Sequence, residues 1–169
     1  NRRSVSELVI SFAVAMLRHI PASHKEVQNG KWEQHVGGLL SGRMVGIIGC
    51  GFIGKDLVEL LQPWGCTILA NDILDFDDFY TRFGVIPVEL EDLLQRSDVV
   101  TLHVPHDDST NNILSGVRLG LMKQSAVLIN TARGRLVDEA VLKKMLMEKS
   151  LAAAAFDVFN TEPPDDLEL

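Results

Sequence analysis

From residue 44 onward, short apolar runs alternate with amphipathic stretches along the chain. The apolar runs predict strands, which we place at 44–48, 67–71, 85–88, 98–104, 125–130 and 151–156. The stretches between them predict helices at 52–62, 89–95, 115–122 and 138–148, the last with Asp138 as its N-cap. Because the strands are apolar at every position, helices are expected to cover both faces of the sheet. The pattern therefore predicts an α/β fold with a doubly wound, mostly parallel sheet.

The opening segment, 1–21, has a different pattern. Ser4 and Glu7 have the spacing of a capping box, and an apolar run follows them. We therefore expect a helix from about Ser4 to His19, ended by Pro21 and buried on more than one side because it is apolar nearly all round. Residues 21–43 are expected to form a loop, with Trp32 as its one large apolar anchor.

Three glycines follow the first predicted strand and open the next helix. Gly49 is expected to allow a sharp turn, Gly51 to let bare backbone approach a pyrophosphate, and Gly54 to let the helix pack close to the strand. The start of the helix offers free N–H groups to phosphates. The acid Asp72 follows about twenty residues on, where a carboxylate binds ribose hydroxyls. This segment predicts a Rossmann-like dinucleotide-binding core at 44–160.

The residues around Asp72 also predict the choice of dinucleotide. A carboxylate hydrogen-bonds the free ribose hydroxyls of NAD and repels the phosphate of NADP. The next two residues, Ile73 and Leu74, offer no arginine for that phosphate. We therefore expect NAD as the cofactor.

Composition narrows the possible partners. The 169 residues suffice for one domain, and the net charge of −7 argues against binding to nucleic acid or to an anionic membrane. The longest apolar stretch, residues 8–17, is too short to span a bilayer. Cys50 and Cys66 have no metal-binding spacing, so we expect no metal site and two reduced thiols in a cytoplasmic protein.

Polar and special residues follow several strands at their carboxyl ends, where ligands of such sheets bind. They include His103, Val104 and Pro105 after one strand, and Asp157, with Glu162 further on, after the last. Arg133 comes almost directly after another apolar strand. Because burying a guanidinium without a partner is costly, Arg133 predicts an anionic ligand.

Four motifs resemble those of one known family. They are Leu40-Ser41-Gly42-Arg43 before the first strand, Leu102-His103-Val104-Pro105, Asn130-Thr131-Ala132-Arg133-Gly134, and Ala155-Phe156-Asp157-Val158-Phe159 followed by Thr161-Glu162-Pro163. Together they resemble the NAD-binding domain of the D-isomer-specific 2-hydroxyacid dehydrogenases, the group that includes D-3-phosphoglycerate dehydrogenase. The resemblance covers nearly the whole chain and implies reversible reduction of a 2-oxo acid to a D-2-hydroxy acid.

The resemblance also implies roles for individual residues. Arg133 would bind the substrate carboxylate and polarise the keto oxygen, and Glu162 would pair with a catalytic histidine. Asp157 would hold the nicotinamide carboxamide. Further cofactor-binding positions are implied at the backbone of Phe52 and Ile53, facing the pyrophosphate, at Thr110 near the phosphates, and beside the nicotinamide at Val104, Pro105, Thr131 and Ala132.

Two parts of the family's active site are missing from residues 1–169. The proton-transferring histidine lies well beyond Glu162 in the family, and none of His19, His24, His35, His103 or His106 takes its place. A second domain, which carries most of the substrate pocket, is also absent. We therefore expect the chain to be the cofactor domain of a larger enzyme, binding NAD(H) weakly alone, with little turnover. Which 2-hydroxy acid the enzyme uses stays open.

Other functions remain open at this point. The corepressors that sense NAD resemble this family closely, including the segments around Arg133 and Glu162, and would bind NAD without turnover. Enzymes that oxidise formate or phosphonite use related scaffolds. An FAD or S-adenosylmethionine domain would leave the segments around Arg133 and Asp157 unexplained. A homodimer is implied by the resemblance.

Overall fold

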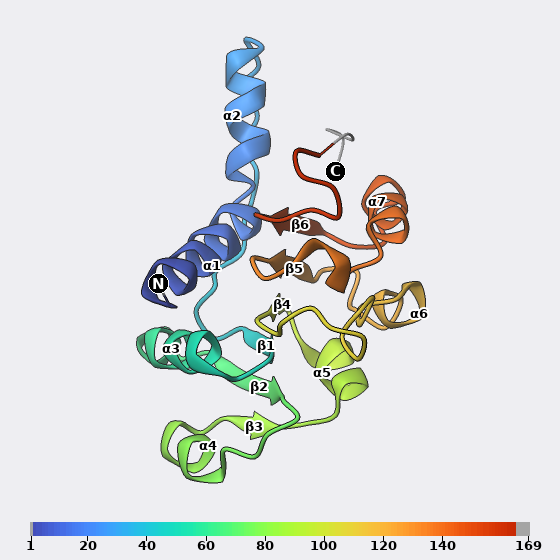
Figure 1. Cartoon of the computed structure of the whole chain (residues 1–169). Coiled ribbons are helices and arrows are strands. Elements are labelled where there is room, and N and C mark those ends of the chain that lie inside the picture. The colour runs from blue at the N-terminus through green and yellow to red at the C-terminus, as the bar shows by residue number, and fades with distance from the viewer. Residues whose placement is uncertain (1, 165–169) are drawn as a thin grey trace.

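The computed structural model describes residues 2–164 and is built on one six-stranded parallel sheet (Figure 1). The strands lie in the order β3-β2-β1-β4-β5-β6. Their bounds are β1 Met44–Ile48, β2 Thr67–Asn71, β3 Ile86–Pro87, β4 Val99–Leu102, β5 Val127–Asn130 and β6 Ala153–Phe156. The predicted Rossmann-like, doubly wound parallel sheet is confirmed.

Helices cover both faces of the sheet and make two cores. The first core contains α1 (Arg2–Leu17), α3 (Phe52–Leu61) and α4 (Asp77–Phe83), and the second contains α5 (Leu90–Arg96), α6 (Gly116–Leu119) and α7 (Glu139–Met147). The short 3-10 helices are η1 (Gln62–Trp64) and η2 (Gly134–Leu136). β1, β2, β4 and β5 are almost wholly buried, as their apolar runs predict.

The strand order reverses between β1 and β4, which pair directly. After β1 the chain moves outward through β2 to β3, and after β4 it moves the other way through β5 to β6. The loops that leave β1 and β4 therefore diverge, which opens a crevice at the carboxyl edge of the sheet. Asp138 accepts a hydrogen bond from Val141 N at 3.1 Å, so it is the N-cap of α7, as predicted.

The opening segment differs from the prediction. α1 already includes Arg2, so Ser4 lies inside the helix and is not its N-cap. α1 ends at Leu17, and a second helix, α2 (Ile20–Gln28), follows His19, whose φ of 55° lies in the left-handed region. Pro21 therefore starts a helix instead of ending one, because its fixed φ suits the first turn, where no N–H is needed. The expected loop at 21–43 was wrong for residues 21–28.

The N-terminal helices differ in how they pack. α1 buries Val9, Ala13 and Leu17 against the first core, and Arg3 pairs with the buried Asp56 of α3 at 3.0 Å. α2 buries no residue. It projects away from the sheet, and the segment that returns to β1 runs beside it (Figure 1). Trp32 is 87% exposed, so it is not the anchor that was expected.

No single described helix is long and apolar enough to cross a bilayer. α1 and α2 reach the required length and composition only as a pair, and they are bent by 61° at the break between them.

Candidate functional site

The turn after β1 requires glycine at two of its three positions. Gly49 has a φ of +92°, and a Cβ there would lie 2.8 Å from the main-chain carbon of His103 at the end of β4. A Cβ at Gly54 would lie 3.2 Å from Ile47 Cγ2 and would also press on the Gly49 carbonyl oxygen. The strand, the turn and α3 therefore pack too closely for a side chain at either position, as predicted for Gly49 and Gly54.

Gly51 differs from the other two glycines because a Cβ there would meet nothing within 4 Å. It is the N-cap of α3 and has no side chain to cap the helix. The N–H groups of the first helical turn, which includes Phe52 and Ile53, have no acceptor within the helix. The turn therefore presents bare main-chain donors to open space, an arrangement that suits a phosphate.

Asp72, at the end of β2, is joined to this turn. Its Oδ2 accepts a hydrogen bond from Cys50 N at 2.6 Å, and its Oδ1 accepts one from Leu74 N at 2.9 Å. Burial raises the pKa of the Cys50 thiol to about 11, so this cysteine stays protonated at neutral pH. The structure thus brings the glycine turn and the acid together, as the sequence motif predicts.

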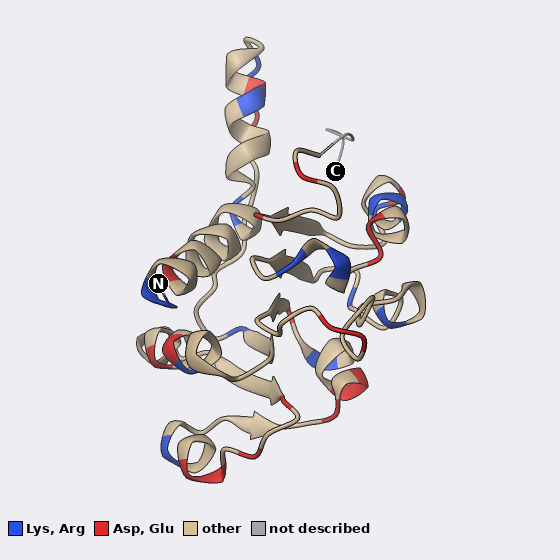
Figure 2. Ribbon diagram, viewed as in Figure 1, with Lys and Arg blue, Asp and Glu red and all other residues tan. Residues whose placement is uncertain are grey.

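A hollow of about 560 Å³ lies beside Asp72. Ile73 and Leu74 line it, and both are exposed, at 100% and 61%. Its rim is acidic, since Asp75, Asp77 and Glu89 line it as well. Figure 2 shows acidic positions along the chain between the end of β2 and the start of α4. Apolar side chains next to the Asp72 carboxylate suit an adenosine, and the negative rim disfavours an additional phosphate.

At the end of β4, burial lowers the pKa of His103 to about 4, so its imidazole is neutral. A hydrogen bond of 3.0 Å joins its Nε2 to Thr101 Oγ1. Its Nδ1 and the Thr131 hydroxyl at the end of β5 are buried and have no partner within the described chain. Buried polar atoms are normally hydrogen-bonded, so these two fit a site that a polar ligand completes.

The loop after His103 holds its own shape through side-chain hydrogen bonds. The Thr110 hydroxyl donates to the Pro105 carbonyl at 2.7 Å and accepts from Asp107 N at 2.8 Å. Val104 is half-buried and Pro105 is exposed. The Thr110 hydroxyl therefore orders this loop. Contact of Thr110 with the phosphates of the cofactor stays a prediction.

The loop after β5 is organised by Asn130, a residue whose role the sequence reasoning missed. Asn130 is fully buried, donates through Nδ2 to the Arg133 carbonyl at 2.9 Å and accepts at Oδ1 from Ala132 N at 3.1 Å. An asparagine at the end of an apolar strand is the signal that could have found it, because a buried amide needs several partners. Arg133 is exposed, so the expectation of a buried guanidinium was wrong.

A second hollow, of about 270 Å³, brings together residues that are far apart in the sequence. Arg133, Glu162 and His106 all line it. Glu162 accepts a hydrogen bond from Phe159 N at 3.1 Å. A Cβ at Gly134 would overlap the main chain of Phe159, so this glycine lets the segment after β6 lie against the arginine loop.

The two hollows lie at opposite ends of one edge of the sheet. The first adjoins the ends of β2 and β3, and the second adjoins the loops after β5 and β6, with the glycine turn between them. β2 and β5 are three strand spacings apart, about 14 Å, which is the scale of an extended dinucleotide. Asp157 is exposed just after β6, and its N–H bonds the Asn130 carbonyl at 3.0 Å.

A parallel sheet in this order, with a glycine turn after β1 and an acid after β2, defines a Rossmann dinucleotide-binding domain. Residues 10–169 match the family model described as the D-isomer specific 2-hydroxyacid dehydrogenase, NAD binding domain. The chain belongs to this family. The predicted family and its cofactor, NAD, are confirmed.

Several curated proteins are similar along almost the whole chain. D-3-phosphoglycerate dehydrogenase of Escherichia coli K12 is 40% identical over 166 residues, covering 96% of this chain and 40% of that protein. Glyoxylate reductase of Korarchaeum cryptofilum is 37% identical over 174 residues, covering 96% of this chain and 52% of that protein. The chain thus spans about half the length of these relatives or less.

Solved structures agree with this assignment. The D-isomer specific 2-hydroxyacid dehydrogenase of Lactobacillus delbrueckii ssp. bulgaricus, in its NAD complexed form, superposes with a TM-score of 0.90 at 29% identity, covering 96% of this chain and 50% of that one. D-lactate dehydrogenase of Aquifex aeolicus, complexed with NAD and lactic acid, gives 0.89 at 28% identity, covering 96% and 49%.

Proposed function

We propose that this chain is the cofactor-binding part of an NAD-dependent D-2-hydroxyacid dehydrogenase, which transfers a hydride between NAD(H) and a 2-oxo acid or D-2-hydroxy acid. The observation that carries the proposal is the placing of Arg133 and Glu162 on one hollow, at the end of the sheet edge opposite Asp72. The relatives described above are named as dehydrogenases and reductases of such acids, which supports the same reaction.

In this proposal Arg133 binds the substrate carboxylate. A guanidinium has five N–H donors in a planar fork, and here Nη1 uses one of them to donate to the Ala132 carbonyl at 2.6 Å. Its other donors suit a carboxylate, which a guanidinium binds through two parallel hydrogen bonds. Its positive charge also polarises the adjacent keto oxygen.

Glu162 acts as a positioning residue for a histidine outside this sequence. Its carboxylate would accept a hydrogen bond from the imidazole and favour the protonated form, which can then protonate the keto oxygen. The hydrogen bond from Phe159 N holds the carboxylate toward the hollow. We assign the pocket for the substrate's side chain to residues outside this sequence as well.

NAD, when bound, accepts or supplies the hydride. The chain's own residues orient it: Asp72 holds the ribose, and Asp157 holds the carboxamide. The pyrophosphate side is formed by Gly49, Gly51, Phe52, Ile53, Gly54 and Thr110, and the nicotinamide side by Val104, Pro105, Thr131 and Ala132.

We also propose a homodimer in the cytoplasm, acting on small acids and not on nucleic acid or membranes. The arm formed by α2 and the returning segment supports the dimer, because it exposes large apolar side chains without a core of its own. These are Ile20, Val27, Trp32, Val36 and Leu39. Light scattering on the purified chain would test the dimer directly.

The reaction is tested in the longer protein with Arg133→Lys. Lysine keeps the charge but loses the fork, so KM for a 2-oxo acid should rise at least about tenfold while the Kd for NADH stays unchanged. Arg96→Lys, at the half-buried arginine of α5 that pairs with Asp92, is the matched control and should leave both constants unchanged. An unchanged KM in Arg133→Lys would refute the role of Arg133.

A further inference from the structure

The arm formed by α2 and residues 29–39 has few interactions that hold it together. α2 contributes nothing to either core. The main-chain hydrogen bonds that attach the returning segment include Lys31 N to the Glu26 carbonyl at 2.9 Å, and Gly38 N to the Leu17 carbonyl at 2.8 Å. A small unit without an apolar core generally needs a cross-link, a bound metal or contact with a partner subunit to stay ordered.

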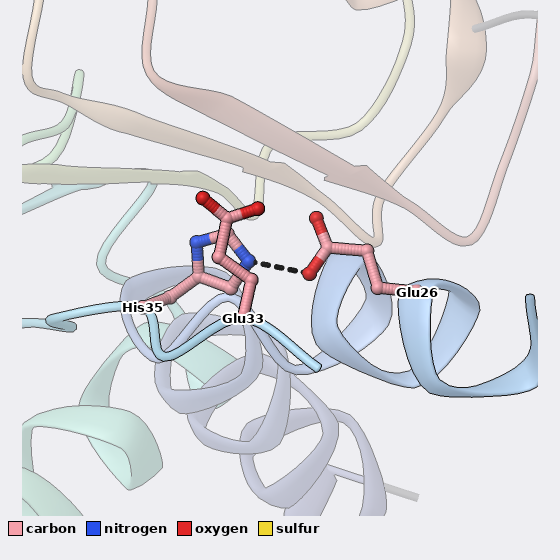
Figure 3. A group of neighbouring side chains, drawn as sticks. All are labelled: Glu26, Glu33 and His35. Atoms are coloured by element: carbon pink, nitrogen blue, oxygen red, sulfur yellow. Dashed lines mark hydrogen bonds and ion pairs between the residues drawn. The ribbon is translucent and has the colours of Figure 1, made fainter. Parts of the chain in front are cut away.

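Three side chains converge between the helix and the returning segment of this arm. Glu26 comes from α2, and Glu33 and His35 come from the returning segment; Figure 3 shows them pointing toward one another. His35 Nε2 lies 2.7 Å from Glu26 Oε2. One possible ligand atom from each residue lies within 4.8 Å of those of the other two. Within residues 2–164, this is the one group of His, Cys, Asp or Glu side chains that comes so close.

The donor set suits a divalent transition metal. One imidazole nitrogen and two carboxylate oxygens are ligands that Zn²⁺ accepts, at about 2.0–2.2 Å each. Ligand atoms around such an ion lie about 3.3 Å apart, so the side chains must close by an ångström or so. Glu33 is exposed and can rotate into place, while Glu26 is half-buried and already lies against His35. Two carboxylates with a neutral imidazole carry a charge of −2, which a divalent ion neutralises.

A second histidine, which could serve as a fourth ligand, lies close to the group. His19, at the break between α1 and α2, has its ring centroid 5.8 Å from that of His35. It is exposed and lies in a left-handed conformation at the N-cap of α2. Rotation of its side chain would bring a second imidazole toward the group, and water can complete the four-coordinate shell otherwise.

We propose that Glu26, Glu33 and His35 bind a divalent transition-metal ion of the zinc type and thereby fasten α2 to the segment that returns to β1. The site is structural, and it is separate from the carboxyl edge of the sheet where NAD binds. Its occupant would order the arm in the same way that a metal orders other small units, because binding and folding of such units are coupled.

The experiment is a Zn²⁺ titration of the chain, stripped of metal with a chelator, followed by calorimetry and repeated with Co²⁺ for its visible spectrum. We expect saturation at a single equivalent. His35→Gln and Glu33→Gln should each weaken binding at least about tenfold, since each removes a ligand. His24→Gln, on the exposed surface of α2, is the matched control and should bind as the unaltered chain does.

Folding and metal binding are measured separately. The cluster lies outside both cores, so circular dichroism and the melting temperature of each metal-free variant should match those of the unaltered chain. Zn²⁺ should slow proteolysis within residues 29–37 of the unaltered chain and leave His35→Gln unaffected. The proposal is overturned if the chain binds no Zn²⁺. It is also overturned if the variants His35→Gln and Glu33→Gln each bind Zn²⁺ as tightly as the unaltered chain.

Discussion

Replacing Gly51 by alanine should weaken NADH binding without disturbing the fold. Gly51 has a φ of −72°, outside the left-handed region, and a Cβ there would meet nothing within 4 Å. The methyl group would therefore point into the open space in front of the α3 N-terminus. That is the space in which we place the pyrophosphate.

The size of the effect follows from the hydrogen bonds at stake. A methyl group would hold a phosphate away from the main-chain donors of Phe52 and Ile53. Hydrogen bonds to a charged group contribute about 1.5–3 kcal/mol each. Losing two weak hydrogen bonds or one strong hydrogen bond reduces the binding free energy by about 3 kcal/mol, which raises the Kd for NADH about a hundredfold. Alanine at an N-cap costs the free chain at most about 1 kcal/mol.

Fluorescence titration with NADH gives the Kd, and urea unfolding gives the stability of the same sample. Gly120→Ala is the matched control, because Gly120 also has a negative φ, of −65°, and lies away from the site, at the end of α6. If Gly51→Ala binds NADH as tightly as Gly120→Ala does, the pyrophosphate does not approach this turn. The role of the glycine turn would then be refuted.

Asn130→Ala should lower the free energy of unfolding by about 2 kcal/mol in urea, because it removes the hydrogen-bond partner of both the Ala132 N–H and the Arg133 carbonyl. Gly134→Ala should lower the free energy of unfolding by about 1–3 kcal/mol and so lower the melting temperature, since its methyl group would overlap the main chain of Phe159. A melting temperature equal to that of the unaltered chain would contradict the packing described. His103, whose pKa falls from 6.5 to about 4 on burial, binds fewer protons folded than unfolded. Stability should therefore decrease as the pH falls from about 6.5 to 4, and His103→Gln should flatten that part of the profile.

The sheet and the glycine turn were predictable because local rules and tertiary structure agree there. Apolar runs such as Met44–Ile48 are buried on both faces, and the glycines at 49 and 54 sit where a side chain has no room. Asp72 was found by its spacing alone, and its hydrogen bond to Cys50 N joins it to the turn.

Other elements were missed because tertiary context decides them. Pro21 reads equally well as the end of one helix or the start of the next, and the left-handed His19 selects the second. α4 has an uneven apolar pattern and is held by Tyr80, which is buried in the first core. Asn130 was passed over because its importance lies in main-chain partners that no sequence motif displays.

The hydrogen bond from Cys50 N to Asp72 ties the carboxylate after β2 to the glycine turn after β1. Removing the carboxylate to admit a phosphorylated cofactor would therefore also release the turn that we propose holds the diphosphate. Retargeting this domain therefore calls for a replacement that still accepts from Cys50 N, such as serine or asparagine, before any cation is added nearby. Because the same side chain would set cofactor selectivity and hold the glycine turn, a change in selectivity requires a compensating change in the turn.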